Sequence, residues 1–149
     1  MKKILNLLKD NKAFQALLNK QNIVVNSQNA EALLIASAFL TLKKDMLIIK
    51  SNQYEANLLY KQVSQMIDDV LYFPVDESYR IESLAASGEL LGQRLSTMYE
   101  LSKEKTHLLI SHGHSVMRYV PNKAVFKKNC MTLKVGDRID VYDLQRFLI

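Results

Sequence analysis

Residues 21–39 constrain the fold of this chain most, because their pattern is strand, loop and helix. Residues 23–25 are a β-branched run of the kind that strands prefer, and residues 26–29 are polar and turn-prone. The next segment, residues 30–42, is apolar on nearly every face, which predicts a buried helix. In nucleotide-binding α/β proteins, a strand, a loop and a helix in this order form the phosphate cradle.

The residues that would hold phosphates are missing from this cradle. A phosphate loop uses glycines for close backbone approach and a Lys-Ser/Thr pair for phosphate and Mg²⁺. This loop has no glycine, and Glu31, which would repel a phosphate, lies where the lysine would be. We therefore expect a degenerate nucleotide site that binds no cofactor. Its loop residues are Asn26, Ser27, Gln28, Asn29, Ala30 and Glu31.

Length and composition indicate one soluble domain. The chain has 149 residues, of which 48% are hydrophobic and 23% charged. Its single cysteine, Cys130, excludes an internal disulfide and fits a reducing compartment. No apolar stretch is long enough to span a bilayer, and the first apolar run is interrupted too early for a signal peptide. We expect a cytoplasmic protein without membrane contact.

The net charge of +5 is concentrated toward the end of the chain. Residues 111–149 contain seven basic and three acidic residues, which gives +4. Such a segment can contact nucleic acid or an acidic partner. A solvated basic face is the favoured interpretation, because Phe126 is the only aromatic residue between Lys123 and Lys134. The candidate contact residues are Arg118, Lys123, Lys127 and Lys128.

Continuous apolar runs at residues 46–49, 70–73 and 107–110 predict strands of a parallel sheet covered by helices on both faces. We expect Leu47, Ile48 and Leu109 to be buried on central strands. A further strand is predicted at residues 131–133, followed by a turn at Gly136-Asp137.

Helices are predicted between and around these strands. Two short helices, the second capped by Asn11, occupy residues 1–20. Three longer ones are predicted at residues 53–67, with Ser51 as the cap, at residues 84–102 and at residues 141–148. The inward stripe of the helix at 84–102 is assigned to Leu84, Leu91, Leu95 and Met98, and Gly88 and Gly92 would let another backbone approach.

Several residues could carry chemistry, and a structural role is favoured for each. Asp76-Glu77 resembles the acidic pair of a helicase, but no phosphate loop is present to bring Mg-ATP. His112 and His114 lack an evident third ligand for a metal. Nothing marks Cys130 as a nucleophile, so a free, partly buried thiol is expected. Arg94 and Arg118 are also assigned structural roles, which we expect to involve carboxylates at the rim of the core.

Four segments, taken in order and spacing, resemble those of one protein family. They read LYFPVDE at residues 71–77, GQRLSTMYEL at 92–101, ISHGHSVMRYVP at 110–121 and TLKVGDRID at 132–140. The chain resembles the N-terminal, excinuclease-B-like region of bacterial transcription-repair coupling factors. The resemblance implies a P-loop NTPase or helicase-like (RecA-like) fold that has lost its ATP site. Only residues 75–83 separate the third strand from the next helix, which is too short for the damage-clamping hairpin of excinuclease B.

The resemblance also implies a division of the chain and a set of partners. Residues 1–130 would form the degenerate helicase-like domain, and residues 131–149 would lead into a following module that is absent here. The chain would be a non-catalytic scaffold of a parent that displaces stalled RNA polymerase at DNA lesions and recruits the excision repair machinery. ATP and Mg²⁺ would belong to the parent's motor. Excinuclease A, RNA polymerase and duplex DNA would be reached through the parent.

The last predicted helix still carries apolar residues where the given sequence ends. Its side chains Leu144, Phe147 and Leu148 are therefore expected to drive association of two copies in a crystal or at high concentration. Two other functions stay open at this point. One is an active nucleotide-binding helicase fragment, and the other is a small basic DNA-binding module.

Overall fold

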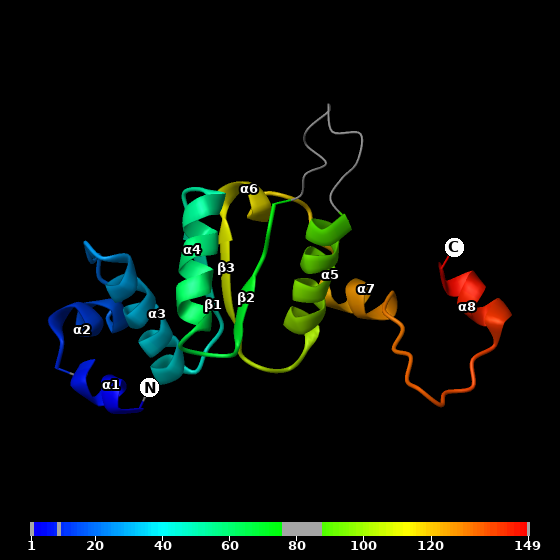
Figure 1. Ribbon diagram of the computed structural model, residues 1–149, viewed down its shortest axis with the longest axis horizontal. Helices are drawn as coiled ribbons and strands as arrows, with labels where there is room; N and C mark the ends of the chain where they lie inside the picture. The colour runs from blue at the N-terminus through cyan, green and yellow to red at the C-terminus, as the bar shows by residue number, and fades with distance from the viewer. Residues whose placement is uncertain (1, 9, 76–87, 149) are drawn as a thin grey trace.

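Three parallel strands form the sheet in the computed structural model, which describes residues 2–8, 10–75 and 88–148 (Figure 1). They are β1 (Met46–Lys50), β2 (Val70–Tyr72) and β3 (Leu108–His112). The order is β1-β3-β2, so the last of them in sequence lies in the middle. Ile110 of β3 is opposite Ile48 on one side and Tyr72 on the other. The predicted α/β class with a parallel sheet is confirmed.

Helices lie on both sides of this sheet (Figure 1), with α3 and α4 on one side and α5 and α7 on the other. At the end of a long coil, α8 stands apart from the body. None of the described helices is long and apolar enough to cross a membrane. The helices are α1 (Lys2–Leu8), α2 (Lys12–Leu18), α3 (Gln28–Leu42), α4 (Gln53–Ser64), α5 (Gly88–Ser102), α6 (Gly113–Val116), α7 (Lys123–Lys128) and α8 (Val141–Leu148).

The main core lies between the sheet and the pair α3 and α4. Leu108 and Ile110 of the central strand and Val63 of α4 are fully buried in it. As predicted, α3 is largely buried, because small residues such as Ala32 and Ala36 let its backbone pack closely against α4. A second, smaller cluster around Phe14 joins α2 to the other face of α3.

Asparagine side chains begin three of the helices. Asn11 accepts hydrogen bonds from the second and third backbone N–H groups of α2, as the sequence predicts. Asn122 caps α7, a helix that the sequence pattern did not predict. At α4 the cap is Asn52, which accepts from the Glu55 N–H at 2.9 Å, and the assignment of Ser51 is wrong. The Ser51 hydroxyl donates instead to the Glu55 carboxylate.

The predicted strand at residues 23–25 is wrong, since this segment is neither strand nor helix. Its side chains alternate: Ile23 and Val25 pack against the cluster around Phe14, whereas Val24 is 90% exposed. The β-branched residues thus follow the period-two pattern of a strand without pairing with a neighbouring strand in the described chain. Residues 131–133 are also irregular and pair with no strand of the described chain, so the strand predicted there is wrong.

The placement of β1 differs from the expectation of a central strand. In the described sheet it pairs only with β3, so it is an edge strand. Leu47 is 53% and Ile49 52% exposed, because alternate side chains point away from the core. The prediction that Leu47 is buried on a central strand is wrong. Ile48 packs against the core from that edge strand, and Leu109, on the central strand β3, is half-buried.

The buried face of α5 is polar, contrary to the predicted stripe. Leu91 and Leu95 are 56% and 46% exposed, while Arg94 and Thr97 are buried. Gly88 and Gly92 face open space, since, apart from their chain neighbours and the backbone of α5 itself, no atom of the described chain comes within 4 Å of a Cβ built there. Leu84 and the pair Asp76-Glu77 lie outside the described residues.

Candidate functional site

The first turn of α3 lies beside the carboxyl end of β1. Lys50, the last residue of β1, extends its ammonium group to Glu31 and contacts both carboxylate oxygens, at 2.8 and 3.1 Å. Both side chains are only partly exposed, at 21% and 30%. A carboxylate at the amino end of a helix is favoured by the helix dipole. Glu31 of the same chain therefore supplies the negative charge that the amino end of α3 favours, and Lys50 neutralises it.

The other residues of the loop at 26–31 hold the same corner in place. Asn29 accepts a hydrogen bond of 3.0 Å from the Gln62 side chain of α4. Ser27 occupies the cap position of α3, but its hydroxyl makes no capping hydrogen bond. Asn26 lies in a bend ahead of it, and Gln28 and Ala30 belong to the first turn of the helix.

A polar hollow of about 210 Å³ opens at this corner between α3, α4 and β1. Glu31 and Lys50 line it from one side, and Glu55 and Gln62 from α4. Two carboxylates face the single lysine, so the hollow offers an approaching phosphate at least as much repulsion as attraction. The arrangement suits a structural joint between helices and sheet better than it suits nucleotide phosphates.

At the carboxyl end of β2 the chain is fixed by donors from α5. Arg94 donates to the Pro74 carbonyl oxygen at 2.7 Å, and its guanidinium lies 4.0 Å from the centre of the Phe73 ring. Thr97 donates to the Tyr72 carbonyl oxygen at 2.8 Å. The structural role predicted for Arg94 is thus supported, and the partners seen here are a carbonyl and a ring where a carboxylate was expected.

The two histidines near the carboxyl end of β3 lie close together but differ in burial, since His114 is exposed. His112 is buried and its Nδ1 lies 2.9 Å from the Ser115 hydroxyl, while the rings of His112 and His114 are 6.1 Å apart. Burial, and secondarily the nearby His114, lowers the pKa of His112 below its usual value. Within the described residues no group of three or more His, Cys, Asp or Glu is placed to hold a metal.

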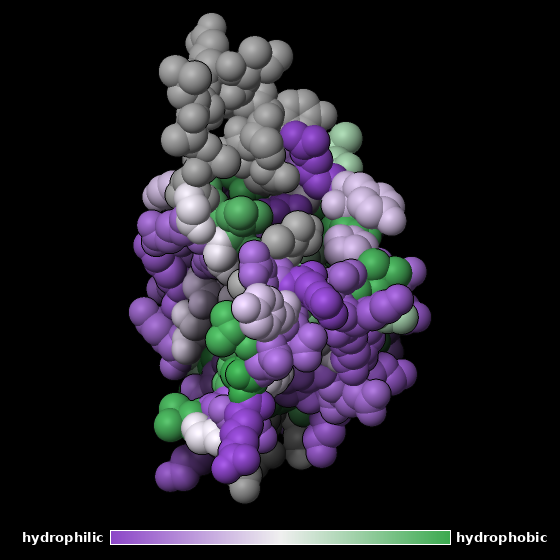
Figure 2. All heavy atoms as spheres, turned by 90° about the vertical axis from the view of Figure 1, so that its right-hand side faces the viewer, coloured by the Kyte–Doolittle hydropathy of each residue, from purple (hydrophilic) through white to green (hydrophobic). Residues whose placement is uncertain are grey.

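The candidate contact residues of the basic segment lie in and just before α7. Lys123, Lys127 and Lys128 belong to α7 and are exposed, and Arg118 follows α6 and is partly buried. Cys130, just after α7, is a free and partly buried thiol, as predicted. Figure 2 looks onto the end of the molecule that carries α8, where hydrophobic side chains are scattered among hydrophilic ones.

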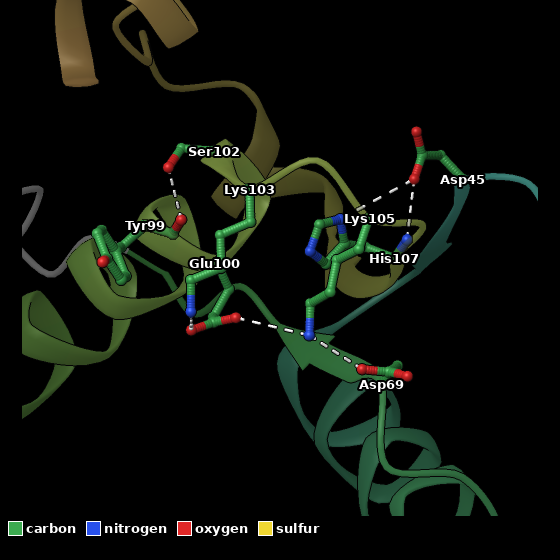
Figure 3. Close-up of polar contacts among 8 residues, drawn as sticks. All are labelled: Asp45, Asp69, Tyr99, Glu100, Ser102, Lys103, Lys105 and His107. Atoms are coloured by element: carbon green, nitrogen blue, oxygen red, sulfur yellow. Dashed lines mark hydrogen bonds and ion pairs between the residues drawn. The ribbon is translucent and has the colours of Figure 1, made fainter.

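Sequence reasoning missed a polar network at the opposite, amino edge of the sheet (Figure 3). Lys105, ahead of β3, pairs with Asp69 ahead of β2 at 3.0 Å and with Glu100 of α5 at 3.7 Å. Asp45, ahead of β1, accepts from the His107 backbone N–H at 2.9 Å. The loops before all three strands are thereby joined. The only sequence signal is a charged residue within three positions ahead of each strand: Asp45, Asp69 and Lys105.

Two pKa shifts follow from this network. The hydrogen bond from Lys103, helped by the charges of Lys103, Lys105 and His107, lowers the pKa of Glu100. The hydrogen bond to Asp69, with the charges of Asp69 and Glu100, raises the pKa of Lys105. Both shifts favour the charged forms, so the network contributes electrostatic stability while these groups are ionised.

The fold is that of an α/β domain with a parallel sheet. At the carboxyl end of β1, the Glu31 carboxylate of α3 pairs with Lys50. Over 98% of its length the chain is 31% identical to the transcription-repair-coupling factor of Staphylococcus haemolyticus. It is 30% identical to that of Staphylococcus epidermidis over 93% and 29% identical to that of Staphylococcus aureus over 91%. The homologues of this chain are transcription-repair-coupling factors, and the resemblance drawn from its motifs is confirmed.

The chain spans only 12–13% of the length of these relatives. No family model and no solved structure matches it.

Proposed function

We propose that this chain is a non-catalytic scaffold segment of a transcription-repair-coupling factor, with a helicase-like (RecA-like) fold whose nucleotide site is degenerate. Similarity to such factors over 91–98% of the chain supports the family part of this proposal. The parent would displace stalled RNA polymerase at DNA lesions and recruit excision repair proteins. This segment would contribute a rigid α/β body to that parent.

The observation that carries the non-catalytic part is the ion pair between Glu31 and Lys50. A nucleotide-binding cradle needs an unpaired cation and backbone N–H groups that glycines leave accessible. Here the loop at 26–31 has no glycine, and Lys50 is held by a carboxylate of the same chain. Binding ATP would require this pair to separate and Glu31 to accept a phosphate as its neighbour.

Calorimetric titration of the chain with Mg-ATP and with Mg-ADP tests the proposal. We expect no saturable heat up to millimolar nucleotide. A nucleotide-binding protein with an intact phosphate loop, titrated in parallel, serves as the positive control. Saturable binding to this chain at micromolar nucleotide would instead favour the active nucleotide-binding fragment.

A basic DNA-binding module is the second candidate, because Lys123, Lys127 and Lys128 are all exposed on one short helix. Phosphate contacts give binding that weakens steeply with salt. Under the scaffold proposal, duplex DNA should bind this chain weakly at low salt, with a shallow salt slope. A steep slope that flattens when Lys127 and Lys128 are changed to Gln would favour the DNA-binding module.

A further inference from the structure

The outer face of α5 is an exposed apolar stripe. Leu91, Leu95 and Tyr99 are 56%, 46% and 42% exposed and follow one another at intervals of four residues. This spacing places the three side chains in one row along the helix, over a length of about 12 Å. On the opposite side, Arg94 and Thr97 hold α5 to the end of β2. The stripe is therefore not the face by which α5 packs on its own domain.

Two glycines flank this stripe and leave room for a second helix. Gly88 and Gly92 are one turn apart in α5, and, beyond the backbone of α5 and their chain neighbours, no atom of the described chain lies within 4 Å of a Cβ built on either. A glycine inside a helix lowers its stability by roughly 1 kcal/mol relative to alanine. Beside an exposed row of large apolar residues, such glycines let another helix approach the backbone closely.

A helix of matching size and character is present in the same chain. The eight residues of α8 span about 12 Å, and α8 is amphipathic. Among its apolar residues, Val141 is 74% exposed and Phe147 39%. In Figure 1, α8 is separated from α5 by α7 and a coil, so it does not cover the stripe of its own chain.

The charges at the two ends favour antiparallel packing of α8 on α5. Glu89 lies in the first turn of α5, and Lys103 follows its last turn. Asp140 precedes α8, and Arg146 lies in its last turn. With the helices antiparallel and Leu144 opposite Leu95, Asp140 would lie about 6 Å along the axis from Lys103 and Arg146 about 6 Å from Glu89, and the helix dipoles would also oppose each other.

We propose that the outer face of α5, formed by Leu91, Leu95 and Tyr99 with Gly88 and Gly92, is the docking surface for α8 of a second copy of this chain. One eight-residue helix covers too little surface for a stable interface, which typically buries about 1,200–2,000 Å². Reciprocal exchange of α8 between two copies provides two such contacts related by two-fold symmetry. The inference does not depend on the proposed scaffold function.

Sedimentation equilibrium over a wide concentration range tests this interface. The mass should rise with concentration from 17.1 kDa toward twice that value. Gly92→Gln should raise the dissociation constant by roughly tenfold or more, because the new side chain overpacks the contact. The same substitution meets open space in the single chain, so the unfolding temperature at low concentration should not fall. A chain that stays monomeric at all concentrations would overturn the proposal.

A charge exchange tests the antiparallel orientation. Glu89→Arg alone and Arg146→Glu alone should each weaken association, and the double variant should recover much of it. Both side chains are exposed in the single chain, so neither change is expected to disturb folding. Additive weakening in the double variant would contradict the pairing of these two residues.

Cross-linking shows whether the α8 that contacts α5 belongs to a second copy or to the same chain. In a Cys130→Ser background, chains carrying Leu95→Cys and chains carrying Leu144→Cys are mixed and oxidised. We expect a disulfide-linked pair of unlike chains. A chain carrying both cysteines that closes an internal disulfide at high dilution would show that α8 returns to its own α5, and the second copy would be excluded.

Discussion

Arg94 holds the carboxyl end of β2 by donating a hydrogen bond of 2.7 Å to the carbonyl oxygen of Pro74, twenty residues earlier in the chain. Both residues are buried, so no water replaces this bond when the donor is removed. We expect Arg94→Met to lower the free energy of unfolding by about 1–3 kcal/mol. Urea unfolding measures the change. Gln93→Met, at a less buried position of the same helix, is the control and should be nearly neutral.

The central strand should be more sensitive to truncation than the edge strand. Leu108 and Ile110 are fully buried, whereas Leu47 is 53% exposed. Leu108→Ala should therefore cost about 2–5 kcal/mol of unfolding free energy. Leu47→Ala should cost less than about 1 kcal/mol, since surface substitutions usually have small effects. Equal losses in urea unfolding would mean that something covers the outer side of β1 in solution.

The stability should depend on pH through His112. Burial lowers the pKa of this side chain in the folded state, and the unfolded chain takes up the proton near the usual value of 6.5. The contribution of neutral His112 is thus complete above pH 6.5 and is lost as the pH falls through the lowered pKa. In an NMR titration, His112 should titrate at a lower pH in the folded chain than in urea. Identical titration in both states would contradict the buried position.

The stability that the amino-edge network contributes should fall in acid, because Glu100 becomes protonated. Its pKa is lowered mainly by the hydrogen bond from Lys103, so its stabilising effect is present above about pH 4.5 and is lost as the pH falls through the lowered value. Glu100→Gln should therefore unfold at lower denaturant than the parent chain at neutral pH. The difference should shrink as the solution is acidified below the lowered pKa. A difference that is constant with pH would assign the effect to packing and not to charge.

A pull-down with excinuclease A tests the division of labour that the family resemblance implies. By that resemblance, this partner is gripped mainly by the module that follows the present domain. We expect this chain to capture excinuclease A weakly or not at all, and a chain extended through the following module to capture it well. Equal capture by both would place the binding surface within these 149 residues.

Periodicity alone predicted the main elements but not how α5 faces the sheet. Helical spacing assigned Leu91 and Leu95 to the interior, and the structure exposes both. The buried positions belong to Arg94 and Thr97, because the carbonyl groups that end β2 need donors. A hydropathy pattern contains no information about which carbonyl groups a neighbouring strand leaves unpaired.

The sequence predicted which residues form the candidate site at 26–31, but it did not predict which residues they contact. The absence of glycine and the presence of Glu31 were evident from the sequence, but the pairing with Lys50 joins residues 19 positions apart. The segment at 23–25 was predicted as a strand from its β-branched residues, although strand formation also requires a neighbour to pair with. By contrast, α7 had a local signal that was overlooked: Asn122 as a cap and two lysines in the last turn.

The position of β3 in the middle of the sheet has a consequence for synthesis of the protein. Neither β1 nor β2 has a described strand partner until Leu108–His112 has been made. The hydrogen bond from the His107 N–H to Asp45 can form only after 62 further residues have been added to the chain. At about 5–20 residues per second, this corresponds to roughly 3–12 s on the ribosome. From the completion of β2 until that point, the nascent chain carries two apolar strands without described backbone partners, which are segments of the kind that chaperones shield.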